Sequence, residues 1–308
     1  MSLIRYMVKR ITGMIPMLFI VSVIIFLFIH VIPGDPARIA LGADATGEAV
    51  ANLRTSMGLD QPLFQQYVTY IKNLLRGDFG NSFKSHEPVS KILWEKFLLT
   101  LELTLWGMGW SLIVGILMGV IAAVRRNRWP DYVGMSISIV GLSMPEFWFG
   151  FLLIDLFSIK LGWLPTGGTE GWGSLIMPSL TLGIGVLGLF ARFTRTSLLE
   201  VMKEDYIRTA KAKGVSKQLV ILKHALRNAL IPLVTMSGIQ FGFMLSGAVV
   251  IEVVFSWPGM GVLLVDAVKF RDFPVIQGSM FLFTLEFLVI TLIVDLLYAL
   301  LNPQMRID

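Results

Sequence analysis

Long apolar runs alternate with short polar segments along the chain. The runs at residues 11–32, 98–124, 132–159, 175–193, 229–254 and 275–301 are each long enough to cross a bilayer, which takes about 17 to 25 apolar residues in a helix. The chain has 308 residues, of which 55% are hydrophobic and only 15% are charged, against roughly 25% charged in soluble domains. This pattern predicts an all-α membrane protein with six transmembrane helices.

The first apolar run follows Arg5, Lys9 and Arg10, as the core of a secretory signal would. Residues 11–32 are longer than the roughly 7 to 15 residues of such a core, and no small-x-small cleavage site follows them. We therefore expect a retained transmembrane helix.

Basic residues gather at alternate ends of the runs, which is the distribution that marks cytoplasmic segments. They stand before the first run at Arg5, Lys9 and Arg10, after the second at Arg125, Arg126 and Arg128, and after the fourth between residues 192 and 227. This distribution predicts that both termini lie in the cytoplasm, and it accounts for the net charge of +5 without nucleic acid as a partner.

The polar segment after the first run shows two helical patterns and is expected to be a folded external (periplasmic) segment. One pattern precedes Gly58, and the other starts after Pro62 and ends at Gly77. Their apolar positions are Val50, Leu53 and Met57, then Leu63, Tyr67, Ile71 and Leu74. The segments at residues 161–174 and 255–274 are expected to be external loops, rich in Gly and Trp, which suit turns and the membrane interface.

We divide the chain into three parts on this basis. Residues 1–32 are the N-terminal tail and first span, residues 33–97 the external helical segment, and residues 98–308 a five-helix membrane core. The core contains a cytoplasmic loop at residues 198–228.

That cytoplasmic loop is far longer than most connections between helices in bundles, which take roughly 2 to 8 residues. Leu199, Met202, Tyr206 and Ala210 share one helical face. Gly214 can end this helix in a left-handed turn, and Ser216 can cap a second helix. The loop therefore predicts a helix, a sharp turn and a helix. This helix pair fits a docking surface for another protein. It also fits an amphipathic helix pair that rests on anionic lipid through its lysines, Lys211, Lys213, Lys217 and Lys223.

Several acidic residues lie within the apolar runs, where a charge at mid-depth costs about 2.5 to 3.5 kcal/mol. Glu102 and Asp295 lie near span ends and are expected to reach the interface. The substrate-pathway candidates are Glu146, Asp155, Glu252 and Glu286, with structural pairing between helices as the alternative for each. Pro145 precedes Glu146 directly and predicts a bend there.

Glycine pairs four residues apart suit close helix packing in bilayers, as at Gly115 with Gly119 and at Gly238 with Gly242. The pattern at Gly183, Gly185 and Gly188 lies inside a membrane run, so we interpret it as packing and not as a dinucleotide site.

Ligand chemistry is sparse in the sequence. The chain has no cysteine, and its three histidines, His30, His86 and His224, are too scattered for a metal cluster. No GxxxxGK[ST] phosphate loop and no His-Glu-x-x-His zinc motif occurs. These absences argue against an ATPase, a metalloenzyme and an intramembrane protease.

The loop sequence MKEDYIRTAKAKG at 202–214, followed by HALRNALIP at 224–232, resembles the coupling loop of binding-protein-dependent ABC permeases of the peptide, nickel and glutathione importers. The resemblance continues in IPGDPAR at 32–38, GLDQPLFQQY at 58–67, GDFGNS at 77–82, FSWPGMG at 255–261, RDFPVIQG at 271–278 and DLLYALLNP at 295–303. NRWPD at 127–131 and LGWLP at 161–165 are most similar to the glutathione-type and dipeptide-type permeases.

This resemblance implies a type I ABC importer permease fold, a multi-pass location in the bacterial inner membrane and the role of first permease in a heterodimer. The expected partners are a second homologous permease, two cytoplasmic ATPases that bind ATP and Mg, a periplasmic substrate-binding protein and membrane lipid. No cofactor is expected on this chain. The resemblance assigns ATPase coupling to Tyr206, Arg208, Thr209, Ala210, Lys211 and Gly214.

The expected cargo is a di- or oligopeptide or a glutathione-like peptide. The alternatives are an importer of nickel or another chelated metal, and a stand-alone secondary transporter. A secondary transporter would explain six spans and buried carboxylates but would leave the long cytoplasmic loop without a purpose.

Overall fold

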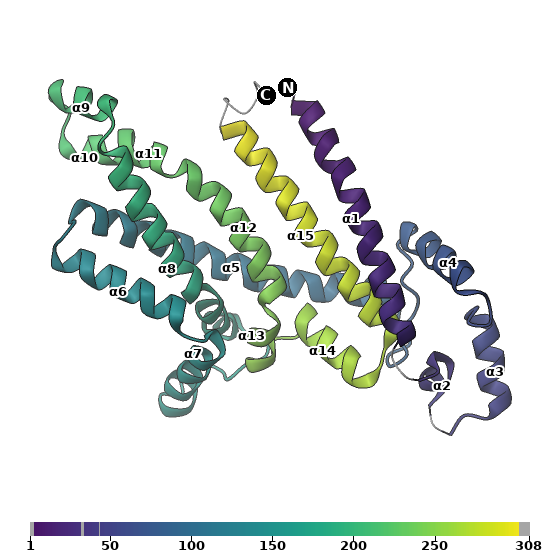
Figure 1. Ribbon diagram of the computed structural model, residues 1–308. Coiled ribbons are helices and arrows are strands. Elements are labelled where there is room, and N and C mark those ends of the chain that lie inside the picture. Colours follow the sequence, from purple (N-terminus) through teal and green to yellow (C-terminus); the bar gives the residue numbers. More distant parts are fainter. Residues whose placement is uncertain (1–2, 32–33, 43, 302–308) are drawn as a thin grey trace. The chain divides into compact units, whose positions relative to one another are not determined.

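The computed structural model of the chain describes residues 3–31, 34–42 and 44–301. Among these residues there are helices and loops but no β-strand, apart from one isolated bridge between Asn81 and Pro88 (Figure 1). They divide into two compact units: the first unit is mainly residues 101–257 with 290–301, and the second unit is mainly residues 6–100 with 258–289. Four residues of the quoted motifs, Ile32, Pro33, Asn302 and Pro303, lie outside the described residues.

Four described helices are long and apolar enough to cross a membrane, and two bent helix pairs raise the number to six if each pair makes one span. The single helices are α1 (Leu3–Val31), α5 (Val89–Val124), α8 (Ile176–Val201) and α15 (Phe273–Leu301). In the first bent pair, α6 (Trp129–Ser143) is followed by α7 (Glu146–Leu153), which continues into the π-helix Ile154–Lys160. In the second, a helical stretch is followed by α12 (Ile231–Gly247); that stretch consists of α10 (Lys217–Leu219), the π-helix Val220–Ala225 and α11 (Leu226–Ala229). The prediction of six spans is confirmed on that count.

The third predicted span is broken at its centre. Helix α6 ends at Ser143, and α7 begins at Glu146 after a turn of 104°. Met144 has extended backbone, because the Pro145 ring disfavours helical geometry in the residue before it. Pro145 itself is also extended. The predicted bend at Pro145 is confirmed, and it is sharper than a kink.

Several element boundaries differ from those expected. Helix α5 begins at Val89 rather than at residue 98, because Val89 and Leu93 continue its apolar face into a buried cluster of the second unit. Helix α8 likewise continues to Val201, since Thr194 and Leu198 are still buried. The fifth run, residues 229–254, contains α12 and a separate short helix, α13 (Val249–Val254).

The loop predicted at residues 255–274 is instead mostly helical. Helix α14 (Met260–Phe270) occupies most of this segment. Met260 and Ala267 lie two turns apart and are both buried in the same cluster as Val89 and Leu93, which gives the helix an apolar face. The other predicted loop, 161–174, contains only the start of a 3-10 turn, Trp172–Leu175.

The polar segment of the second unit contains the two helices expected there and one more. These are α2 (Pro36–Leu41), α3 (Gly47–Ser56) and α4 (Leu63–Leu75). Gly58 and Gly77 have φ of 70° and 73°, the left-handed backbone that favours glycine after a helix. Burial, with a smaller effect of Tyr67, raises the pKa of Tyr70 to about 12.

A buried carboxylate ties two distant parts of the second unit together. Asp272 accepts hydrogen bonds from the Ser82 hydroxyl at 2.5 Å and from the Phe83 backbone N–H at 3.1 Å, and its own residue is almost fully buried. The tie joins the segment before α5 to the segment before α15.

Helix α8 is the centre of the first unit, with α6 beside it (Figure 1). A methyl group added at Gly119 of α5 would lie 2.5 Å from the Ala191 carbonyl oxygen of α8. One added at Gly188 would clash with the Ser138 backbone of α6. Gly115 and Gly183 face α8 and α5 neighbours just as closely, and Gly238 faces Val294 of α15. The prediction that these glycines serve packing is confirmed at these positions.

A two-pronged ion pair fixes the start of α6 to α8. Arg195 Nε and Nη2 donate to the two carboxylate oxygens of Asp131 at 2.6 and 2.8 Å. Asp131 also accepts from the Asn127 backbone N–H at 2.9 Å, and its side chain is only 3% exposed. Sequence reasoning missed this pair, although Asp131 closes the NRWPD motif.

We predict that Gly119→Ala destabilises the protein by about 1 to 3 kcal/mol, because its methyl group would push α5 away from α8. Gly109→Ala is the matched control on the same helix: nothing lies within 4 Å of the added methyl, so about 0.5 to 1 kcal/mol of stabilisation is expected from alanine's better helix propensity. Thermal unfolding of the purified chain in detergent measures both. Equal midpoints for the two variants would contradict the assigned contact.

We also predict that Asp131→Ala costs about 3 to 5 kcal/mol, since it leaves the Arg195 guanidinium partly buried without its partner. Asp155→Ala is the control, because the Asp155–Lys160 pair is 49% and 64% exposed and pairs of that kind contribute about 0 to 1 kcal/mol. The same unfolding assay compares them, and a small, equal loss in both variants would refute the ranking.

Candidate functional site

The loop at residues 198–228 folds as the predicted helix, turn and helix. Helix α9 (Asp205–Ala212) is followed by Gly214 at φ 78°, and a second helical stretch runs from Lys217 to Ala229 through α10, a π-helix and α11. Ser216 stands at the start of that stretch but makes no capping hydrogen bond with its side chain, so that detail of the prediction is wrong. We call the segment from α9 to α11 the coupling segment.

The coupling segment has a small hydrophobic core of its own. Its buried side chains are Ala123 of α5, Leu198 of α8, Ile207 and Ala210 of α9, and Val220, Ile221, Ala225 and Ala229 of the second stretch. Tyr206, expected on the apolar face, is instead 42% exposed, and Ile207 takes the buried position. Ala210 is only 8% exposed, so its small size serves packing inside the chain and its methyl group is not free to touch a partner.

The outer face of the coupling segment is exposed and mixed in character. Arg208, Thr209, Lys211 and Gly214 are all exposed. Tyr206 accepts a hydrogen bond from the Asn228 side-chain amide at 2.7 Å, which links the two helical stretches. Leu219 and Leu222 are 53% and 61% exposed beside the lysines, leaving an apolar surface with basic neighbours.

A cavity of about 280 Å³ lies at the bend of the third span. Glu146, the first residue of α7, lines it together with Gly185 of α8 and with Gln240 and Phe243 of α12. A methyl group at Gly185 would lie 3.5 Å from Glu146 Oε1, so glycine leaves room beside the carboxylate. The bend therefore places an acidic group and an amide at one opening between α8 and α12.

The three other predicted pathway carboxylates lie elsewhere. Asp155 forms an ion pair with Lys160 at 2.6 Å on the π-helix after α7. Glu252 is fully buried in α13, and Glu286 is 7% exposed in α15. None of them lines the cavity at the bend, whereas Glu146 does.

A second cavity, of about 530 Å³, lies further along the same two helices and was missed by sequence reasoning. Its polar lining comes from Arg192, Thr196, Ser197 and Glu200 of α8, with Met236 of α12 opposite. The signal in the sequence was a set of polar residues at helical spacing at the end of the fourth apolar run and just after it.

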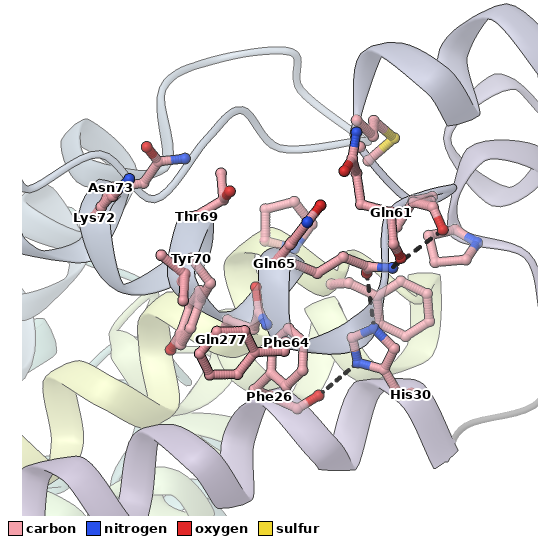
Figure 2. A pocket seen from close by; sticks show the side chains of 18 of the residues that line it. Phe26, His30, Gln61, Phe64, Gln65, Thr69, Tyr70, Lys72, Asn73 and Gln277 are labelled. Atoms are coloured by element: carbon pink, nitrogen blue, oxygen red, sulfur yellow. Dashed lines mark hydrogen bonds between the residues drawn. The ribbon is translucent and has the colours of Figure 1, made fainter.

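The largest of these cavities, about 670 Å³, belongs to the second unit and lies between α1 and α4 (Figure 2). His30 there contacts the Phe26 carbonyl at 2.8 Å and the Gln66 side-chain oxygen at 3.1 Å. Gln66 in turn donates to the Gln61 carbonyl at 2.8 Å, so these polar groups already hold the helices in place. Within the described part of the chain no group of three His, Asp or Glu side chains could hold a metal ion.

The amino-acid sequence matches family models and named proteins of membrane transport. Residues 115–307 match the family model described as binding-protein-dependent transport system inner membrane component, and residues 3–104 match the N-terminal model of the same kind of component. The protein named glutathione transport system permease protein GsiC from Escherichia coli (strain K12) is 54% identical over 304 residues, covering 99% of each chain. The protein of the same name from Salmonella typhi is 53% identical over 304 residues, with the same coverage.

Solved structures show the same fold at low identity. An inward-facing MetNI methionine ABC transporter structure matches with a TM-score of 0.59 and 18% identity, over 70% of this chain and 99% of that chain. A structure of an amino acid ABC transporter with histidines matches with a TM-score of 0.52 and 17% identity, over 67% of this chain and 92% of that chain. The predicted type I importer permease fold is confirmed. The chain is thus a multi-pass transport component and belongs to the family of binding-protein-dependent transport system inner membrane components.

Proposed function

We propose that this chain is the first permease of a heterodimeric importer that carries glutathione or short peptides from the periplasm into the cytoplasm. The observation that carries the proposal is 54% identity along the whole chain to a permease named for glutathione transport. Two ATPases, a second permease and a periplasmic binding protein complete the assembly, with both termini of this chain on the cytoplasmic side.

The coupling segment is the part of the chain that receives the work of ATP hydrolysis. Its exposed side chains, among them Tyr206, Arg208, Thr209 and Lys211, present a surface with donors and aliphatic carbon for a groove on an ATPase. Ala210 and the buried core beneath it transmit the movement, because a packed core moves as one body. Gly214 gives the turn its shape.

Movement of the coupling segment reaches the membrane helices through two rigid links. Helix α8 continues without a break from the cavity at the bend to Val201, four residues before α9 begins. The Asp131–Arg195 pair ties the start of α6 to that helix. A displacement at the coupling segment therefore shifts α8 and α6 together, which changes access to the cavity beside Glu146.

Import by the reconstituted complex tests the proposed function. Proteoliposomes that contain this chain, its second permease and its ATPases are given labelled glutathione, a dipeptide or nickel on loaded binding protein, with and without internal ATP. We expect ATP-dependent uptake of glutathione or the dipeptide. Uptake of nickel alone would assign the chain to metal import, and uptake without ATP would favour a secondary transporter.

We predict that Thr209→Trp lowers ATP-driven uptake at least about tenfold, because an indole on the exposed face of α9 would block a groove that must close around it. Thr209→Ser is the matched control: it keeps the hydroxyl that donates to the Asp205 carbonyl at 3.0 Å. Gly214 is a poorer site for the test, because any side chain at its positive φ strains the turn.

Uptake and co-purification of the ATPases with the tagged chain measure this effect. Full uptake by Thr209→Trp, with ATPases bound as in the wild type, would contradict the docking role of α9.

A further inference from the structure

The two cavities between α8 and α12 lie on one continuous face of each helix. On α8 they involve Gly185, Leu189, Arg192, Thr196 and Glu200, which follow one another at steps of three or four residues. On α12 they involve Met236, Gln240, Phe243 and Gly247 at the same spacing. Residues so spaced share a helix face, so the two cavities lie in line along α8 and α12, and we call the two cavities together the α8–α12 groove.

The composition of this groove distinguishes it from a surface that faces lipid. The exposed side chains of α1 are apolar at Ile15, Phe19 and Ile20, as expected in a bilayer. The exposed side of α8 instead carries Arg192, Thr196 and Glu200. These residues belong to the basic-rich stretch that is expected to mark the cytoplasmic side, so this end of the groove lies at the cytoplasmic end of the fourth span.

Arg192 is a cation with no partner among the described residues, since none of their carboxylates lies within ion-pair distance of it. Arg195, three residues further on, is engaged with Asp131 and so is the structural arginine of this helix. Arg192 is exposed on the groove with all its guanidinium donors available, the geometry that binds a carboxylate with two parallel hydrogen bonds.

Glu146 lies on the same groove, beside Gly185 of α8. Gly185 precedes Arg192 by seven residues on that helix. Seven residues of helix rise about 10.5 Å. Three extended peptide residues span about 10 Å. The Glu146 carboxylate, beside Gly185, and the backbone of Arg192 are therefore separated along α8 by roughly the length of a tripeptide-sized solute, about 10 Å.

We infer that the α8–α12 groove is the translocation path of this permease and that it holds a short zwitterionic peptide at two points. Glu146, with Gln240 beside it, receives the cargo's amino group, and Arg192 receives its carboxylate. The inference rests on the proposed function, because it gives the cargo of that importer its place and orientation. Each contact is a single charge pair in a wet groove, which is weak enough to allow release toward the cytoplasm.

The orientation of the peptide cargo in the groove follows from the direction of α8. Its C-terminal end leads into the coupling segment, so Arg192 lies nearer that end than Glu146 does. A peptide that bridges the two groups has its carboxylate ahead as it moves toward the coupling segment. Glu200, two further steps along the same face, repels that carboxylate once it leaves Arg192.

Selectivity for the cargo's end groups tests the inference. The reconstituted complex is given binding protein saturated, as checked beforehand, with a tripeptide, its C-terminal amide or its N-acetyl form. The wild type should import the free tripeptide fastest. Arg192→Gln should cut the preference for free acid over amide about tenfold, and Glu146→Gln should do the same for free amine over acetyl. Arg128→Gln, an exposed cation outside the groove, should leave both preferences unchanged.

A second measurement uses the wild-type complex, so it does not depend on how well the variants assemble. A tripeptide with a diazirine in its C-terminal residue is trapped by light during turnover, and labelled peptides are mapped by mass spectrometry. Label on residues 189–197 or on α12 supports the inference. Label confined to other helices overturns it, as does an unchanged acid-to-amide preference in Arg192→Gln. Absence of tripeptide and glutathione uptake by the wild type would instead contradict the proposed function itself.

Discussion

Close backbone contact at glycines is the interaction on which the first unit depends. In a bilayer there is no water to expel between helices, so association relies on dispersion and on how closely the backbones approach. Helix α8 meets α5 at Gly115 and Gly119 and meets α6 at Gly188, with carbonyl oxygens in direct contact with the glycines. These contacts occupy one side of α8. The other side is left free to carry polar groups, so the packing face and the functional face of one helix are determined together.

Charged groups follow the same division of α8. Arg195, on the packed side, meets Asp131 in a paired and nearly buried geometry that satisfies both charges. Arg192 stands on the open side and has no such partner among the described residues. Two arginines one helical turn apart thus have different physical roles, and their surroundings, not their residue type, separate them. The same holds for the carboxylates: Asp155 forms an ion pair with nearby Lys160, whereas Glu146 lines the cavity at the bend.

Much of the fold could be predicted from the sequence, because long apolar runs and proline or glycine at fixed positions act locally. The bend before Glu146 needs only the ring of Pro145, and the turn after α9 needs only a residue that tolerates positive φ, as Gly214 does. The errors arose where contacts distant in sequence decide the outcome. Helix α14 is stabilised by the cluster around Val89, and Ala210 is buried by Val220 and its neighbours. The role of Arg192 also required knowing which face of α8 was already occupied.

The core beneath α9 has a consequence for how the importer is assembled. A loop that became ordered only on meeting an ATPase would have to give up conformational entropy at that moment, which weakens binding. Here Ile207, Val220 and Ala225 are already packed in the chain by itself. On the proposed function, the surface that the coupling segment offers to an ATPase is therefore preorganised, since its core is packed within this chain alone. Dissociation and rebinding of an ATPase would then require no refolding of this segment.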